Sequence, residues 1–550
     1  MKKTKSIIAL SLVLILICML FASCQGKETP TTQKDPTPST TNTEPAKTEP
    51  AKTEEPEKTE EPAKTDEPEE TQPEETPSLV FNPGEIVHLK MGFMDNGDSG
   101  SQFGERMLES LNPYLEETYG LHLDIDYFSM GDWKTKVQLS LFGGEVYDLM
   151  PYLFDQRMTT MYNLQLATPM SKLLEQYAPD ALERMAPYLD ACRMNGELYS
   201  MPTLKNWASN HYVVMRKDIL DEIGLTEKAR NMTTWSEYTE IMDAVREKYS
   251  ADGIYGYGIT PMVGNFGSNS YIVNGDKFED FWQWDEVGDK SGTLMLEDGK
   301  ITFKMKDPRY QAHIAMLKDW YDRGITWPDA AYAQGTMTDD LMKQGVLFSM
   351  TAASELGIEQ TKSTKTGREL ICVKVHSGMI RTSAVQSWSL GIPVTAEEPE
   401  AAAYFINTLY TDPTVMNYII RGVEGVDYEV VDGQAKYGDD PCYMQDDFVI
   451  GDNTILLPVY GNGADFYDRV LEDIHNAAVS PYMGFVLDTA SLSDFISQIS
   501  AVNDQYNGAI STGAYTEELF NEYVSKLELA GVQDYLDEIQ KQLDAWVASR

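Results

Sequence analysis

Residues 25–78 contain almost no apolar side chains, and this segment divides the chain more sharply than any other feature. It consists of Thr, Glu, Pro and Lys in irregular repeats such as Glu44–Pro50, and larger apolar residues return only at Leu79. Such a composition cannot bury enough surface to offset the entropy of ordering. We therefore expect a disordered, Thr/Glu/Pro-rich tether at 24–78. The long chain that follows predicts a folded body of at least two domains.

The first residues have the pattern of a secretory signal peptide at 1–23. A basic start, Met1–Lys5, precedes an apolar run at 7–21 and small residues before Cys24. The run is shorter than the ~20 residues of a spanning helix, although an uncleaved anchor helix is an alternative. Ala22–Cys24 resembles a lipobox, from which Phe21 departs because Leu, Val or Ile is usual there. This resemblance implies that Cys24 is lipidated and holds the protein at the outer face of the cell membrane.

Three cysteines remain in the body, Cys192, Cys372 and Cys442. Their odd number and the absence of C-x-x-C spacing are not typical of a disulfide framework. At most one disulfide is possible, and three buried small apolar residues are the simpler interpretation.

The acidity of the chain belongs to the body as well as to the tether. The net charge is −43, of which residues 25–78 contribute 6 Lys against 15 Asp and Glu, and residues 1–24 contribute +3. Such a surface repels nucleic acid and anionic lipid headgroups. We therefore expect no nucleic-acid partner, and membrane contact through the lipid anchor only.

The start of the body alternates strands and helices. Apolar residues alternate at 86–93 and 121–127, and helical patterns follow at 103–115 and 133–142, before a further strand at 147–154. This order predicts an α/β domain with a largely parallel sheet.

A second unit of the same class begins near His211–Met215. Thr234–Glu237 is a capping box that starts a helix, and Glu297–Lys300 is a hairpin turn between two short strands. Asp307 and Pro308 supply a cap and a first-turn proline for another helix. Apolar residues at three–four spacing predict a C-terminal helix at 532–546 that packs on the core.

Motifs of catalysis and of metal binding are not found in the sequence. It has no G-x-S-x-G, no P-loop and no H-E-x-x-H. The six histidines are scattered, and the loop at Asp95–Gly100 departs from a calcium-binding EF-hand at two ligand positions, so we expect no metal and no cofactor. Abundant carboxylates leave a glycosidase pair open. The histidines stand at positions 88, 122, 211, 313, 376 and 475.

Several tryptophans occur at expected loops or element ends, where they could stack on the apolar faces of sugar rings. Core packing is the alternative for each of them. Asp95 and Asn96 follow the first strand, and ligands of open α/β sheets bind beyond the carboxyl ends of strands. The predicted ligand-binding residues are therefore Asp95, Asn96, Trp133, Trp207, Trp282, Trp284 and Trp388.

From Val87 to Trp546 the body resembles the family 1 extracellular solute-binding lipoproteins of ATP-driven sugar importers, in the large subgroup of Gram-positive bacteria. Each matching motif is modest, but their order extends over most of the body. The segments that carry the resemblance are Gly196–Pro202, Arg216–Leu225, Thr234–Tyr238, Trp320–Ile325, Gly391–Thr395, Gly422–Tyr428, Gly484–Asp488 and Gln540–Trp546.

The resemblance implies a periplasmic-binding-protein-like α/β fold of two lobes, with a hinge and an interlobe cleft that closes on ligand. Lobe 1 would comprise 85–206 plus 378–425, and lobe 2 would comprise 207–377 plus 426–550. The implied partners are two permease subunits and an ATPase of an ABC importer, and the implied state is a monomer. Trp207 and Trp388 would lie near the points where the chain crosses between lobes.

The sequence thus predicts a binding protein without catalytic activity, which captures an oligosaccharide and delivers it by hinge closure. Two alternatives remain open: a cell-surface glycoside hydrolase, and a surface sugar-binding or sensor protein without transport. A peptide or another solute also remains open as the ligand.

Overall fold

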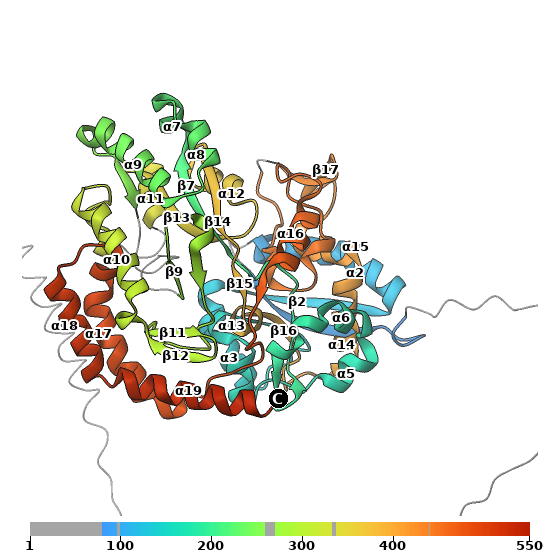
Figure 1. Cartoon of the computed structure of the whole chain (residues 1–550). Coiled ribbons are helices and arrows are strands. Elements are labelled where there is room, and N and C mark those ends of the chain that lie inside the picture. Colours follow the sequence, from blue (N-terminus) through green and yellow to red (C-terminus); the bar gives the residue numbers. More distant parts are fainter. Residues whose placement is uncertain (1–79, 96–98, 259–269, 333–336, 439) are drawn as a thin grey trace, which may run out of the picture. The chain divides into compact units, whose positions relative to one another are not determined.

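Figure 1 shows the computed structural model of the chain, which describes residues 80–95, 99–258, 270–332, 337–438 and 440–550. The predicted signal peptide, the predicted lipidation site Cys24 and the predicted tether lie outside the described residues. Within the ranges that the structure describes, no helix has the length and apolarity that a membrane span requires. The described residues belong to one compact unit.

The first strands confirm the α/β pattern expected from the sequence. β1 (Val87–Asp95) pairs in parallel with β2 (Leu121–Ser129), and α2 (Ser99–Tyr119) connects them. α3 (Met130–Phe142) follows, and β3 (Met150–Leu153) is entirely buried. The alternation of Leu89, Met91 and Phe93, each at most 1% exposed, gives β1 one core face.

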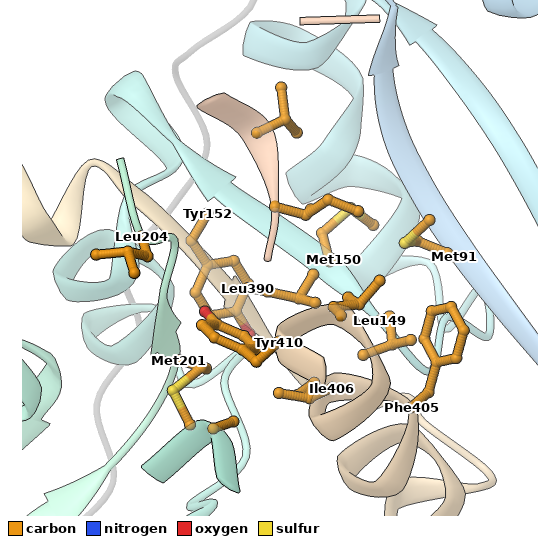
Figure 2. Packing of buried hydrophobic residues seen from close by; sticks show 14 of the residues in the cluster. Met91, Leu149, Met150, Tyr152, Met201, Leu204, Leu390, Phe405, Ile406 and Tyr410 are labelled. Atoms are coloured by element: carbon orange, nitrogen blue, oxygen red, sulfur yellow. The ribbon is translucent and has the colours of Figure 1, made fainter. Parts of the chain in front are cut away.

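β3 also belongs to a three-stranded sheet that joins distant parts of the chain. β16 (Trp388–Gly391) lies between β3 and β6 (Met201–Pro202) and is antiparallel to both. This departs from a purely parallel sheet. Figure 2 shows the surrounding core, in which side chains from β1, β3, β16 and α14 pack together. The helices of this region are α4 (Met158–Asn163), α5 (Ser171–Tyr177), α6 (Pro179–Met185), α13 (Thr382–Gln386), α14 (Pro399–Thr411), α15 (Pro413–Arg421) and α16 (Phe466–Asn476).

A four-stranded sheet forms the centre of the second region. Its strand order is β14 (Leu370–His376), β7 (Asn210–Arg216), β13 (Leu347–Ser354) and β8 (Tyr255–Gly258). Every residue of β7 is buried, because apolar clusters cover both faces of the sheet. Its helices are α7 (Lys217–Ile223), α8 (Thr226–Asn231), α9 (Trp235–Tyr249), α10 (Pro308–Asp322), α11 (Met337–Gln344) and α12 (Ile358–Thr366).

The local signals of the second region are confirmed. Thr234 and Glu237 form the capping box of α9, and Asp307 caps α10 with Pro308 at its first position. The hairpin of β11 (Leu294–Glu297) and β12 (Lys300–Phe303) turns through Asp298 and Gly299, both at positive φ. The remaining strands are β4 (Arg193–Met194), β5 (Glu197–Leu198), β9 (Tyr271–Val273), β10 (Phe281–Gln283), β15 (Met379–Ile380), β17 (Tyr428–Val431), β18 (Gln434–Tyr437) and β19 (Ala478–Val479).

Three C-terminal helices, red in Figure 1, share a separate apolar cluster with the β11–β12 hairpin, and α19 packs against β12. They are α17 (Ser493–Thr512), α18 (Glu517–Leu529) and α19 (Val532–Ala548). The prediction of a core-packing C-terminal helix is confirmed by α19, whose Leu536, Ile539 and Leu543 are at most 1% exposed.

The apolar clusters show where the chain passes from one packed region to another. The first cluster draws its residues from 87–208, 380–420 and 443–483, the second from 213–375, and the third from 272–314 and 485–543. The cluster membership thus changes near 208–213, near 375–380 and after Met483. The predicted lobe boundaries at 206–207, 377–378 and 425–426 stay a prediction.

The three cysteines of the body are free. Cys192 is fully buried, and burial raises the pKa of its thiol to about 12. The interpretation as small apolar residues therefore holds for Cys192, whereas Cys372 and Cys442 are only half-buried.

Candidate ligand-binding cleft

The backbone at Gly378 lies directly against the backbone at Ala208, beside the candidate site. A Cβ atom at Gly378 would overlap the carbonyl oxygen of Ala208, so only glycine permits this approach. The Gly378 amide also donates a hydrogen bond to Asn210 Oδ1 at 3.3 Å. The contact fixes the segments before β7 and after β14 against each other, at the point where the packing clusters change.

A cavity of about 390 Å³ opens at this junction. Its walls come from all three clusters, since Ala208 belongs to the first, Tyr271 to the second and Leu294 to the third. The cavity therefore lies between separately packed regions, where a relative movement of the regions would change its width. Its lining residues are Ala208, Ser209, His211, Ser270, Tyr271, Gln283, Trp284, Glu286, Asp289, Gly292, Leu294, Lys304, Ala353 and Arg381.

A second cavity of about 610 Å³ adjoins the first and shares Glu286, Asp289 and Arg381 with it. On one side it is lined by α4, α13 and Trp388. On the other side it is lined by the loop 285–290 and the segment 482–489. Each volume falls in the range of about 300–1,000 Å³ that is typical of small-molecule sites. Together the two cavities form a cleft, which we call the interregion cleft.

An ion pair between Glu286 and Arg381 forms the shared wall of the interregion cleft. Arg381 also donates to Ser270 Oγ at 2.9 Å, and Ser270 Oγ donates to Glu286 Oε2 at 3.0 Å. Ser383 Oγ lies 3.3 Å from the other carboxylate oxygen, Glu286 Oε1. The network joins the loop after β10 to the segment after β15, so the position of each charged group depends on the other.

Three buried polar atoms on residues that line the smaller cavity have no hydrogen-bond partner among the described residues. They are His211 Nε2, Gln283 Oε1 and Arg381 Nε. A buried polar group without a partner costs about 1–3 kcal/mol, so native proteins keep few of them. All three residues line the same cavity, which makes it the candidate site for a ligand that carries both donors and acceptors.

His211 enters this site as a neutral imidazole. It is 5% exposed and packs against the rings of Tyr271 and Phe281, at centroid distances of 4.5 and 4.8 Å. Burial lowers the pKa of His211 to about 3, with smaller contributions from His376 and Arg381. Its ring can therefore accept or donate a hydrogen bond without carrying a charge at neutral pH.

The other charges of the interregion cleft are held within its walls. Asp285 accepts hydrogen bonds from Ser480 Oγ and from the Val287 amide, and burial raises the pKa of its carboxyl. Asp289 accepts from Tyr535 Oη at 2.8 Å. Burial lowers the pKa of Lys304 to about 8, while the nearby charge of Asp289 opposes this shift.

Two of the predicted tryptophans line the interregion cleft. Trp284 lines the smaller cavity, and its Nε1 donates to Leu294 O at 3.0 Å. Trp388 lines the larger cavity, with Phe154 and Phe448 against it at 5.1 and 4.7 Å. The Lys205 ammonium lies 4.6 Å from the centre of the Trp388 ring.

The other predicted residues lie outside the lining of both cavities. Asp95 is 2% exposed and accepts hydrogen bonds from the Gly100 and Ser101 amides, so it caps α2. Trp133 is fully buried, and Trp207 packs against Tyr188 at 4.6 Å. These contacts are structural.

Trp282 is half-buried between Trp284 and the Arg309 guanidinium, at 5.1 and 4.5 Å. It too lies outside the lining of the interregion cleft. Asn96 lies outside the described residues.

The sequence analysis missed His211, Gln283, Glu286 and Arg381, because it searched for aromatic residues. A usable signal was present, since His211 and Arg381 each follow a predicted crossing by three or four residues. Glu286 comes two residues after Trp284, which was predicted. No pattern in the sequence pairs Glu286 with Arg381, because they lie 95 residues apart.

Comparison with known proteins identifies the type of molecule. The model of the family described as bacterial extracellular solute-binding protein matches residues 109–436. A domain of unknown function matches residues 481–548. A carbohydrate ABC transporter substrate-binding protein of Streptococcus pneumoniae is 21% identical over 465 residues, which cover 82% of this chain and 90% of that protein.

Solved structures share the fold over most of the chain. The N-glycan transport solute binding protein of Streptococcus pneumoniae matches with a TM-score of 0.70 and 20% identity, over 84% of this chain and 99% of that chain. The same protein in complex with Man5GlcNAc matches with a TM-score of 0.58 and 19% identity, over the same shares. A human-milk-oligosaccharide (HMO) binding solute-binding protein of Bifidobacterium longum infantis matches with a TM-score of 0.57 and 15% identity, over 84% and 99%. The predicted periplasmic-binding-protein-like fold is thereby confirmed.

Proposed function

The chain belongs to the bacterial extracellular solute-binding proteins, and from this premise we propose that it captures an uncharged oligosaccharide in the interregion cleft for an ABC importer. The observation that carries the proposal is the set of unpartnered atoms, His211 Nε2, Gln283 Oε1 and Arg381 Nε, on one cavity. Sugar hydroxyl groups donate and accept hydrogen bonds, so an oligosaccharide offers partners of both kinds.

The size of the interregion cleft supports a ligand of more than one ring. Two adjoining cavities of about 390 and 610 Å³ share a wall, and each has the volume of a small-molecule site. Trp284 and Trp388 add an aromatic side chain to each cavity. Aromatic groups contact the apolar faces of sugar rings, while polar groups bind the hydroxyls.

The charges of the smaller cavity support an uncharged ligand there. Glu286 is paired with Arg381, and Asp289 accepts a hydrogen bond from Tyr535. A charged ligand would need an unpaired opposite charge, because burying an unpaired charge is costly. His211 is neutral at physiological pH, since its pKa is lowered to about 3.

The mechanism that we propose is closure of the regions on the ligand. The cavity walls come from three packing clusters, and the chain passes between them beside Gly378. A ligand that contacts several walls stabilises the closed arrangement by its differential affinity for it. This scheme needs no covalent chemistry. The relatives in the comparison are transport components, which supports a protein without catalytic activity.

Titration calorimetry on the purified protein tests the function. We expect binding of Man5GlcNAc or of a neutral milk-type oligosaccharide, and no binding of an alginate oligosaccharide, whose uronates are anionic. Ligand at about 100 times its Kd should add about 2.7 kcal/mol to the free energy of unfolding. Release of free sugars from any of these glycans would favour a glycoside hydrolase instead. Preference for the anionic glycan would contradict the charge argument.

Membrane attachment is a separate part of the proposal, and it rests on the sequence Ala22–Cys24. We propose that Cys24 carries the lipid, that the tether reaches from the membrane to a monomeric body, and that the body docks on the permease subunits. Cys24→Ala should release unlipidated protein or leave a precursor, because two or three acyl chains supply the anchor. Fractionation with mass spectrometry checks this. Mature acylated protein from the mutant would rule out Cys24 as the anchor.

A further inference from the structure

The exposed face of the β1–β2 pair brings together two histidines that are distant in the sequence. The parallel register places His88 opposite His122, and Asp124 follows two residues later on the same face. The intervening Leu89 and Leu123 point to the core, at 1% and 0% exposure. Strand alternation therefore directs His88, His122 and Asp124 away from the core, side by side.

The potential ligand atoms of these three residues lie within 4.8 Å of one another. His88 Nδ1 is 4.0 Å from Asp124 Oδ2, and His122 Nε2 is 3.9 Å from Asp124 Oδ1. A tetrahedral zinc site with bonds of about 2.0–2.1 Å needs ligand atoms roughly 3.3 Å apart. The His88 and Asp124 side chains are 66% and 61% exposed, so small rotations can close this difference.

One ring nitrogen of His122 is held by a carboxylate, as in many metal sites, and the other faces the Asn112 amide. The Asn112 amide exchanges two hydrogen bonds with the Leu123 backbone, which turns its Nδ2 toward His122 Nε2 at 3.2 Å. Nε2 must accept this hydrogen bond and therefore carries the lone pair. His122 Nδ1–H then donates to Glu116 Oε1 at 2.7 Å. A carboxylate behind a histidine in this way fixes the ring and raises its basicity toward a metal.

The surroundings favour a cation. Lys90 lies on this face, opposite Asp124 in the register, but its ammonium pairs with Asp126 at 2.8 Å. His122 and Asp124 border a cavity of about 590 Å³ whose lining also includes Glu105, Glu109 and Glu116. These carboxylates make the local potential negative.

We propose that His88, His122 and Asp124 bind a divalent transition-metal ion of the zinc class, with Glu116 as the positioning residue behind His122. Two imidazole nitrogens and one carboxylate suit Zn²⁺ rather than Ca²⁺ or Mg²⁺, which prefer oxygen ligands. Water can complete the coordination, because the site is open to solvent. The ion would displace the hydrogen bond from Asn112 to Nε2. None of these residues lines the interregion cleft.

Titration of the full chain with ZnCl₂ in a chelator-free buffer tests the site, with circular dichroism to confirm folding. We expect one Zn²⁺ to bind, and His88→Ala or Asp124→Asn to weaken its binding at least about tenfold. Glu116→Gln should weaken it about 10- to 100-fold, as is usual for a carboxylate behind a ligand. CaCl₂ should produce no binding. His475→Ala, at an exposed histidine outside the cluster, is the matched control and should leave zinc affinity unchanged.

Co²⁺ gives a second, spectroscopic readout. The parent protein should show the absorption bands of four-coordinate Co²⁺, and folded His88→Ala should lose them. The free cysteines are a competing source of ligands, and a cysteine site would keep both zinc affinity and bands in His88→Ala. That outcome, or no binding by the parent protein, would overturn the proposal.

Discussion

The carboxyl end of β1 and the shared wall of the interregion cleft both carry buried polar side chains, yet they differ in how far their hydrogen bonds are satisfied. Asp95 at the end of β1 accepts from two backbone amides and from Gln445 Nε2. At the cleft, His211 and Gln283 each retain a buried atom without a partner among the described residues. Burial alone therefore does not mark a binding residue. An unpartnered buried atom does so only where its residue also lines a cavity, because Trp133 Nε1, Trp207 Nε1 and Gln445 Oε1 lack partners among the described residues as well.

The largest effect should come from Arg381→Ala, which removes one of the three residues common to both cavities. We expect affinity for the glycan to fall at least about 100-fold, or about 2.7 kcal/mol, because Glu286 loses its partner and the ligand loses a donor. Calorimetry measures it. Arg184→Ala is the matched control, since Arg184 pairs with the buried Asp452 at 2.9 Å away from the cleft lining. Equal glycan affinity in Arg381→Ala and Arg184→Ala would mean that Arg381 has no special part in ligand binding.

Trp388→Ala sharpens the comparison by testing an aromatic that lines the interregion cleft. Affinity should fall by about 1–2 kcal/mol, which is typical of a contact aromatic at the centre of a site. Trp282→Ala is the control, because Trp282 stacks on Arg309 outside the cleft lining. A larger loss of affinity in Trp282→Ala than in Trp388→Ala would assign the ligand to another surface.

The burial of His211 as a neutral imidazole predicts that the free energy of unfolding depends on pH. Its pKa is about 3 in the folded chain and about 6.5 in the unfolded chain, so between these values the unfolded chain binds more protons. The contribution of neutral His211 to the free energy of unfolding is complete above pH 6.5. It is lost as the pH falls, by up to about 1.4 kcal/mol per pH unit. Urea unfolding near pH 6.5 and about pH 5 should show a shallower decline for His211→Gln than for the parent.

His376 makes a similar but separate contribution to the pH dependence of stability. Burial lowers the pKa of His376, and the positive charge of Lys374 lowers it further. His475→Gln at an exposed position is the control and should follow the parent curve. An unchanged slope in His211→Gln would mean that His211 is not buried in its neutral form.

The smallest effect is expected from Asp95, whose carboxylate already has hydrogen-bond partners in the protein. Asp95→Ala should lower the free energy of unfolding by about 1 kcal/mol, the usual cost of a lost helix cap, and leave glycan affinity unchanged. Ser129→Ala is the matched control, because Ser129 Oγ accepts from the Asp132 amide and caps α3. A specific loss of affinity in Asp95→Ala would return this residue to the ligand site, where the sequence analysis had placed it.

Local chemistry of the sequence determined much of the fold. The capping box at Thr234, the cap and proline at Asp307–Pro308 and the alternation of 121–127 each depend on residues a few positions apart. Such signals are readable because the interactions that they encode are local.

Only the tertiary structure decided which residues gather at a site. Glu286 meets Arg381 across 95 residues of chain, and His88 meets His122 because β1 and β2 pair in one particular register. The sequence analysis took the scattered histidines as evidence against a metal site, since spacing along the chain carries no information about register. A shift of one residue in that pairing would turn His122 to the other face, so the site exists only in the folded sheet.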